Sequence, residues 1–177
     1  MRKLKNSDLD RLSVAEFKKA DKIPVVVVLD NVRSLNNIGS VFRTSDAFLI
    51  ERVLLCGITA KPPHKDIHKT ALGATESVDW QYYPETKDAI SALKNNGYTI
   101  VAVEQTEDSV GLDNFRLTRE NKYAFVFGHE IKGVQQEIVD QSDISLDIPQ
   151  FGTKHSLNIS VCVGIVLWES YKQLLMR

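Results

Sequence analysis

The sequence has little cysteine, almost no net charge and no long apolar run, and each shortage excludes a class of protein. Its two cysteines, Cys56 and Cys162, lie within apolar segments, so we expect small core residues rather than a disulfide. A formal net charge of -1 provides no overall field that would attract nucleic acid. No apolar run could span a membrane and no secretory signal precedes the charged N-terminus, so a reducing, cytoplasmic location is expected.

Several catalytic and cofactor motifs are also absent. The glycine-rich segment from Gly128 to Gly133 is neither a P-loop nor a GxGxxG fingerprint, which weakens the case for a nicotinamide-dependent oxidoreductase. No Gly-x-Ser-x-Gly elbow supports a hydrolase. His64 and His68 have a spacing that zinc sites use, but no third ligand lies nearby in the sequence, and we expect no metal.

What is present is a regular alternation of strand and helix patterns. The 177 residues, 43% of them hydrophobic and 25% charged, fit one globular domain with a sizeable core. Apolar, β-branched runs predict strands at residues 23–29, 53–56, 77–82, 98–103, 123–127 and 144–148. Helical spacing lies between several of them. The pattern predicts a single α/β domain whose mostly parallel sheet is flanked by helices.

The first 22 residues differ in character from the rest. They are highly charged, and the pattern from Ser13 to Glu16 is that of a capping box, which predicts a short helix packed on the surface. We therefore divide the chain into a charged extension at residues 1–22 and a domain at residues 23–177.

The stretch of residues 148–168, IPQFGTKHSLNISVCVGIVLW, holds the main candidates for function. Pro149 ends a strand because it has no N–H to donate, and residues 161–168 are apolar on nearly every side, as in a buried helix. Ser156 and Asn158 lie at the mouth of this helix. Two interpretations stay open: Ser156 is an N-cap, or the segment is a ligand loop that carries catalytic groups.

Four polar loops follow predicted strands, at residues 30–37, 104–110, 128–133 and 149–158. Because loops after the strands of a parallel sheet gather at one edge, these four are expected to share a pocket.

Three segments, taken in order, resemble the motifs of a known family. They are Asn37-Ile-Gly39-Ser-Val-Phe-Arg43, the segment from Gly128 to Gly133, and Ile148-Pro149 with Gly152 and Ser156-Leu157-Asn158-Ile-Ser160. Together they resemble the SpoU (TrmH-type) RNA 2'-O-ribose methyltransferases of the SPOUT superfamily, from about residue 23 to the C-terminus. Gln150 stands where the family often has Met, and Ile159 where it has Val.

The resemblance implies an α/β fold with a C-terminal trefoil knot, a homodimer, and methyl transfer from S-adenosylmethionine to a ribose 2'-OH of tRNA or rRNA. Members often carry an N-terminal RNA-binding domain. With only residues 1–22 before the first strand, none is expected here, which leaves the target RNA open. A non-catalytic RNA-binding protein on the same fold is the alternative.

The family motifs also assign roles to individual residues. The catalytic group would be Arg43, Asn37, Ser156, Asn158 and Glu130. The methyl donor would be held near Val103, Gly128, Gly133, Ile148 and Leu157. RNA would be bound by local cations, with Lys61, Lys65, Lys69 and Lys154 as the candidates.

Arg43 is the family's proposed activator of the hydroxyl. An arginine is a poor general base, so it would bind the adjacent phosphate and stabilise the developing oxyanion, or else activate the hydroxyl directly, and the sequence leaves both roles open. The alternative for Arg43 is a surface ion pair with Asp46, one turn along the same predicted helix.

Overall fold

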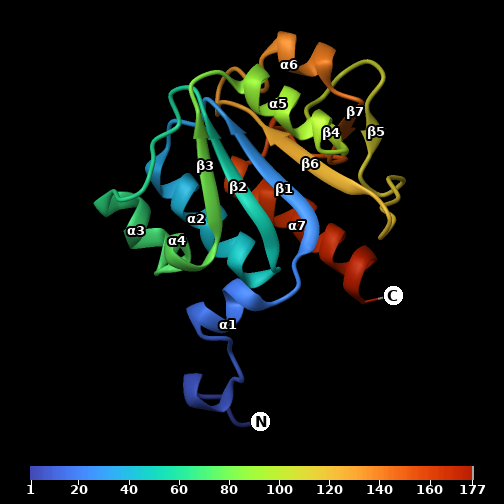
Figure 1. Cartoon of the computed structure of the whole chain (residues 1–177). Helices are drawn as coiled ribbons and strands as arrows, with labels where there is room; N and C mark the ends of the chain where they lie inside the picture. Colours follow the sequence, from blue (N-terminus) through green and yellow to red (C-terminus); the bar gives the residue numbers. More distant parts are fainter. Residues whose placement is uncertain (177) are drawn as a thin grey trace.

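The computed structural model describes residues 1–176, which form three layers, with helices on both faces of one sheet (Figure 1). The strands are β1 (Ile23–Asp30), β2 (Ile50–Cys56), β3 (Asp79–Tyr83), β4 (Tyr98–Val103), β5 (Val110–Gly111), β6 (Lys122–Phe127) and β7 (Ile144–Asp147). Within the described range they make one seven-stranded sheet in the order β3-β2-β1-β6-β4-β7-β5. Every pairing between these strands is parallel, which confirms the predicted fold class.

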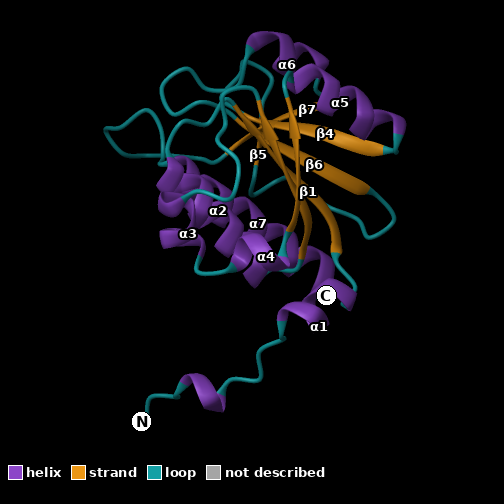
Figure 2. Ribbon diagram, turned by 60° about the vertical axis from the view of Figure 1, so that its left-hand side comes forward, coloured by secondary structure: helices purple, strands orange, loops and turns teal. Residues whose placement is uncertain are grey.

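The helices divide between the two faces of the sheet. They are η1 (Asn6–Asp8), α1 (Val14–Lys19), α2 (Leu35–Ala47), α3 (Lys65–Ala71), α4 (Ala74–Ser77), α5 (Thr86–Asn95), α6 (Gln136–Gln141) and α7 (Ile159–Leu175). Helices α2, α3, α4 and α7 lie on one side and α5 and α6 on the other (Figure 2). Among residues 1–176, no helix combines the length and apolarity that crossing a membrane requires.

The central strand β1 shows why the sheet is covered on both faces. Val25, Val27 and Leu29 point into the larger core, under α2 and α7. Val26 and Val28 point into the smaller core, under α5 and α6. All five side chains are fully buried, so the unbroken apolar run encodes a strand with two packed faces.

The N-terminal extension contains the expected capped helix. The Ser13 N–H donates to Glu16 Oε2 at 2.8 Å, and Ser13 Oγ accepts from the Glu16 N–H at 3.3 Å. Phe17 is buried and anchors α1 to the larger core. The division of the chain at residue 22 stays a prediction.

Helix α7 begins later than the N-cap interpretation of Ser156 requires. Asn158 is its N-cap, because its Oδ1 accepts from the Ser160 N–H at 2.9 Å. The N-cap interpretation of Ser156 is therefore wrong, since a capping oxygen must reach an N–H of the first turn and Asn158 takes that place. The trefoil knot in this C-terminal region stays a prediction.

Gly39 allows α2 and α3 to pack closely. A Cβ at this position would lie 2.1 Å from Thr70 Oγ1 and 2.3 Å from the Ile67 carbonyl oxygen. The glycine of the first family motif thus serves helix packing.

We expect Gly39→Ala to lower the free energy of unfolding by about 1–3 kcal/mol, because α3 must shift to admit the methyl group. Urea denaturation measures the change. Gly152→Ala, on the exposed loop before α7 where the added Cβ meets nothing within 4 Å, is the control. It should change the free energy of unfolding by less than about 1 kcal/mol. Equal stability of the two variants would contradict the packing role.

Candidate active site

A cavity of about 750 Å³ opens beyond the carboxyl ends of β4, β6 and β7. All five residues predicted to hold the methyl donor line it, namely Val103, Gly128, Gly133, Ile148 and Leu157. Three predicted catalytic residues line it as well, namely Glu130, Ser156 and Asn158. Three of the four polar loops therefore share one pocket, as the parallel topology requires.

The glycines of the second motif are needed for the shape of this cavity. The His129 N–H donates to the Gly133 carbonyl at 3.0 Å, and the Gly133 N–H returns a bond to His129 at 2.8 Å. This tight loop brings Gly128 so close that a Cβ on it would lie 2.0 Å from Gly133 C. Gly133 itself has a φ of +68, a left-handed conformation that glycine adopts without strain.

Glu104, a residue that the sequence reasoning did not select, braces the same loop. Its Oε2 accepts from the Val134 N–H at 2.9 Å and its Oε1 from the Gln105 N–H at 3.0 Å. A Cβ on Gly133 would lie 2.1 Å from Oε2. The available signal was its position, an acidic residue directly after an apolar strand.

Glu130 joins the second motif to the start of α2. Its Oε1 accepts from the Ser34 N–H at 2.8 Å, and its Oε2 from the Arg33 N–H at 3.1 Å. Asn37 Nδ2 donates to Oε1 at 3.3 Å. Partial burial opposes ionisation of Glu130, but the hydrogen bonds outweigh it, and the pKa of this carboxyl lies below its ordinary value.

The third motif contacts the first at Asn37. Asn158 Nδ2 donates to Asn37 Oδ1 at 3.3 Å, from the first turn of α7 to the first turn of α2. Asn37, Glu130 and Asn158 thus form one network at the rim of the cavity, although more than a hundred residues separate the first from the last.

The loop after β1 was expected to share this cavity, but its first residue, Asp30, does not line it. Asp30 is fully buried, and its Oδ1 accepts from Thr86 Oγ1 at 2.6 Å and Gln135 Nε2 at 2.7 Å. Its Oδ2 accepts from the Gln135 N–H at 3.0 Å. With its oxygens engaged, Asp30 fixes the segment that follows the second motif. The loop reaches the rim through Asn37 and through the Arg33 and Ser34 N–H groups that donate to Glu130.

Arg43 is not brought to this cavity within one chain. It lies six residues after Asn37, about 9 Å along α2, and is exposed. It lines a separate, smaller cavity with Phe17 and Leu72. In the part of the chain that the structure describes, it makes no ion pair with Asp46, whose carboxylate accepts from Ser77 Oγ instead.

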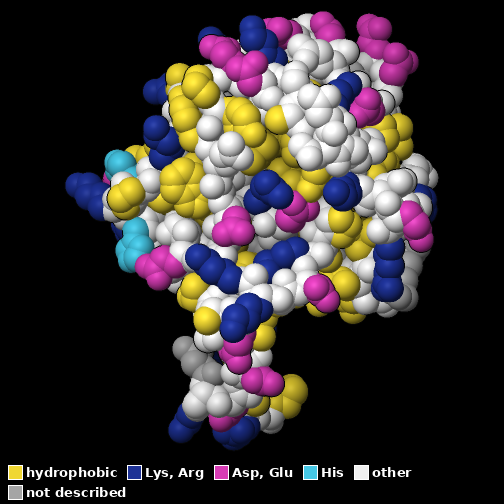
Figure 3. Space-filling view, viewed as in Figure 1, with side chains coloured by type: hydrophobic (Ala, Val, Ile, Leu, Met, Phe, Trp, Pro, Cys, Tyr) yellow, Lys and Arg dark blue, Asp and Glu magenta, His cyan; other side chains and the backbone are white. Residues whose placement is uncertain are grey.

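The predicted RNA-binding cations fall into two places. Lys61, Lys65 and Lys69 lie on or beside α3, where Figure 3 shows cationic and histidine side chains at the edge of the molecule. Lys154 lies on the exposed loop before α7. Among residues 1–176, no three His, Cys, Asp or Glu side chains are grouped to hold a metal ion, and His64 Nδ1 accepts from the Asp66 N–H at 3.2 Å.

We expect Glu130→Gln to lower the free energy of unfolding at pH 7 by about 1 kcal/mol, allowing for solvent screening. Because the folded pKa is lowered, the stabilisation is present above the ordinary value of about 4.3 and is lost as pH falls through the folded pKa. Urea titrations at pH 7 and below pH ~4 should therefore show the difference shrinking with acid. Glu107→Gln, at an exposed acid, is the control. A difference that does not change with pH would show that the Glu130 charge is not responsible.

Comparison with known proteins gives a consistent result. The family model described as "SpoU rRNA Methylase family" matches residues 24–168. The "tRNA (guanosine(18)-2'-O)-methyltransferase" of Borreliella burgdorferi is 34% identical over 85% of this chain and 65% of its own length. This chain thus spans a little less than two thirds of that relative.

Two solved structures share the fold. The TrmH/SpoU tRNA modifying enzyme of A. aeolicus matches with a TM-score of 0.78 and 29% identity, over 89% of this chain and 78% of that one. The AdoMet-bound rRNA methyltransferase of Sinorhizobium meliloti matches with a TM-score of 0.80 and 25% identity, over 90% of this chain and 60% of that one. Residues of all three motifs are joined in one hydrogen-bond network, and the family model matches most of the chain. The chain therefore belongs to the SpoU rRNA methylase family.

Proposed function

We propose that the chain transfers a methyl group from S-adenosylmethionine to a ribose 2'-OH of tRNA or rRNA in the cytoplasm. The observation that carries the proposal is that all three motifs meet at one rim, where Asn37, Glu130 and Asn158 are hydrogen-bonded beside a cavity of about 750 Å³. The AdoMet-bound relative from Sinorhizobium meliloti supports the choice of donor.

The cavity fits the donor in size and in chemistry. Its volume of about 750 Å³ lies within the range of small-molecule sites. Val103, Ile148 and Leu157 give apolar walls for an adenosine. The close approach of Gly128 to Gly133 leaves backbone groups open to polar atoms of the ligand. When bound, S-adenosylmethionine supplies an electrophilic methyl group on a sulfonium.

The residues at the rim would position the ribose. A ribose hydroxyl is a weak nucleophile until its proton leaves, so its orientation and the loss of that proton limit the reaction. The amides of Asn37 and Asn158 and the hydroxyl of Ser156 would hydrogen-bond the sugar. Glu130 would keep the first turn of α2 in place for this task. Arg43 would bind the neighbouring phosphate and stabilise the developing oxyanion.

The position of Arg43 favours a homodimer. Asn36, Ser40, Arg43 and Ala47 form the outward stripe of α2, at helical spacing. Helix α7 packs beside α2 and exposes Val161 and Trp168 at 49% and 47%, one face of that helix. A second copy packed against α2 and α7 would bury this apolar face. The partner subunit's Arg43 would then reach the rim, which Arg43 of the same subunit does not reach.

The activity is tested with labelled S-adenosylmethionine and a mixture of unmodified tRNA and rRNA, followed by mass-spectrometric mapping of 2'-O-methylated nucleotides. Incorporation at a defined ribose is the expected result. If RNA binds but no methyl group is incorporated, the chain is a non-catalytic RNA-binding protein on this fold.

We expect Arg43→Ala to reduce methyl transfer by at least about 100-fold, because it removes a cation that stabilises the developing negative charge. Donor affinity by calorimetry should stay within about twofold of the parent, since Arg43 does not line the donor cavity. Arg52→Ala, at the exposed partner of Glu51 on β2, is the control and should retain activity. An equal loss of donor affinity would contradict the role assigned to Arg43.

Mixing two inactive variants tests whether the arginine acts across the dimer. Asn158→Asp retains an oxygen that can cap α7 but loses the amide that donates to Asn37. A dimer of this variant with Arg43→Ala contains one intact site only if the arginine comes from the partner. Recovery of activity on mixing is expected. No recovery, with mixed dimers confirmed by mass spectrometry, would place Arg43 in its own subunit's site.

A further inference from the structure

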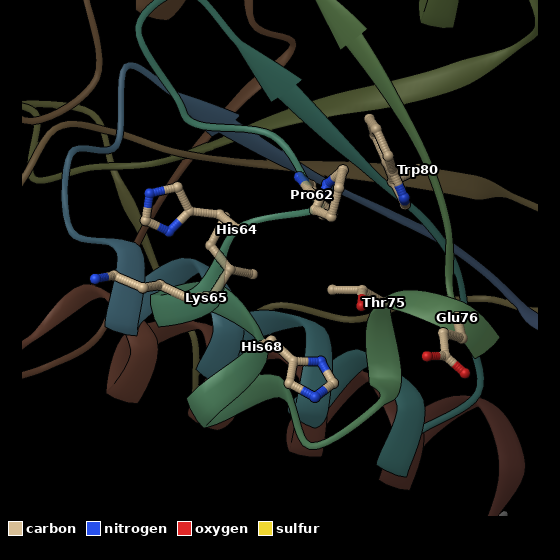
Figure 4. Close-up of a pocket in the computed structure, with 9 residues that line it drawn as sticks. Pro62, His64, Lys65, His68, Thr75, Glu76 and Trp80 are labelled. Atoms are coloured by element: carbon tan, nitrogen blue, oxygen red, sulfur yellow. The ribbon is translucent and has the colours of Figure 1, made fainter.

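A second cavity, of about 530 Å³, lies on the other side of α2, between the edge strand β3, helices α3 and α4, and the loop before α3 (Figure 4). Nothing in the proposed mechanism uses it. We infer that this cavity binds an unpaired nucleobase of the RNA substrate, an inference that rests on the proposed function.

The walls of the cavity suit a flat aromatic ligand. Trp80 of β3 and Pro62 of the loop before α3 lie along one side in Figure 4, and the buried Ile67 also lines the cavity. In Figure 4, His68, Thr75 and Glu76 lie along the opposite side. Unpaired bases are recognised by stacking on aromatic side chains and by hydrogen bonds to their edges.

Three polar groups on these walls are free to make such bonds. Within residues 1–176, no hydrogen bond joins Trp80 Nε1, the His68 imidazole or the Glu76 carboxylate to another part of the chain. The neighbouring His64 differs, because its Nδ1 accepts from the Asp66 N–H. A carboxylate accepts from the amino and imino groups of a base, so Glu76 gives the cavity a preference for bases that donate there.

The rim of the cavity suits a phosphate backbone. Lys65 and Lys69 are exposed and one turn apart on α3, and Lys61 Nζ lies 4.2 Å from the centroid of the Tyr82 ring. Lys65 points away from the cavity in Figure 4, toward the outer surface where a backbone would run. Since Asp66 and Glu76 offset two of these charges, stacking would contribute more to affinity than charge does.

The second cavity is close enough to the donor cavity to serve the same RNA strand. Helix α3 packs directly on α2, and Thr70 Oγ1 donates to the Asn36 carbonyl at 3.0 Å, beside Asn37 at the rim. In the sheet, β2 and β1 lie between the edge strand β3 of the second cavity and β6 of the donor cavity, so three strand spacings, about 15 Å, separate the two sites. A base held near Trp80 would belong to a nucleotide a short way along the chain from the methylated ribose.

Trp80 fluorescence gives a direct test. The chain has two tryptophans, so Trp168→Phe leaves Trp80 as the only tryptophan reporter. Because Trp168 lies on the face assigned to the dimer, this background is used once light scattering shows the mass of the parent protein. We expect short single-stranded oligoribonucleotides to quench its emission in a saturable way. The absence of quenching at concentrations that saturate binding by anisotropy would overturn the inference.

Variants in the same background separate stacking from packing. Trp80→Leu should raise the Kd for the oligoribonucleotide, followed by anisotropy, about 10-fold, and Trp80→Phe, which keeps a ring, less than about threefold. Glu76→Gln should change the preference among the four homopolymers. Lys87→Ala, at an exposed cation on α5 on the opposite face of the sheet, is the control and should leave RNA affinity unchanged. Equal affinities of Trp80→Leu and Trp80→Phe, both folded by circular dichroism, would overturn the inference.

Two further measurements identify the occupant and separate this inference from the proposed function. AMP and GMP should bind much more weakly than the oligoribonucleotides; equal affinity would show a free-nucleotide site and reject the RNA subsite. Donor affinity should be the same in all variants. If Trp80→Leu methylates RNA with an unchanged KM, the base site is rejected while the methyltransferase stands. If quenching occurs but no methyl group is transferred, the proposed function fails.

Discussion

The carboxylate of Glu130 at the N-terminus of α2 is the contact on which the candidate site depends. The first N–H groups of a helix have no partner within the helix, and here an acid from a loop far along the chain accepts from two N–H groups just before and at the start of α2. The helix dipole adds to the attraction. The same carboxylate also accepts from the side-chain amide of Asn37, so Glu130 holds the second motif against the first. Asn158 of the third motif donates to Asn37 and completes the network.

Two other carboxylates bind the main chain directly after the same loop. Asp30 ends β1 and Glu104 follows β4, the two strands that flank β6, and both accept from backbone N–H groups just after the second motif. The loop is thus positioned by charge-assisted bonds to its main chain, which act at short range and fix its direction. The carboxylate of Glu130, in the same loop, is left to bind the start of α2. Gly128 and Gly133 complete the arrangement, because any side chain there would fill the space that these bonds close.

Helix α2 separates two cavities of different character. The larger, at the carboxyl ends of the strands, combines apolar walls with open backbone and suits a small cofactor. The smaller, beyond α3, combines an indole with cations at its rim and suits a nucleotide base. Arg43 lies on the outward stripe of α2 and does not line the larger cavity, which is the reason for our proposal that a second copy brings its guanidinium to the rim.

The sequence by itself determined six of the seven strands and the parallel sheet, because apolar β-branched runs express a local constraint; it missed β5, which has only two residues. The residues that line the larger cavity were expected only from the resemblance of the motifs to a known family. It also placed Glu130 and Asn158 in one site through their motifs. Only the tertiary structure decided that Asn158 rather than Ser156 caps α7, that Asp30 is a buried brace, and that Arg43 faces away from its own cavity. Each of these depends on which distant N–H, carboxylate or helix lies beside the residue. Periodicity along a chain carries no information about that, since it records which face a side chain occupies and not what is packed against it.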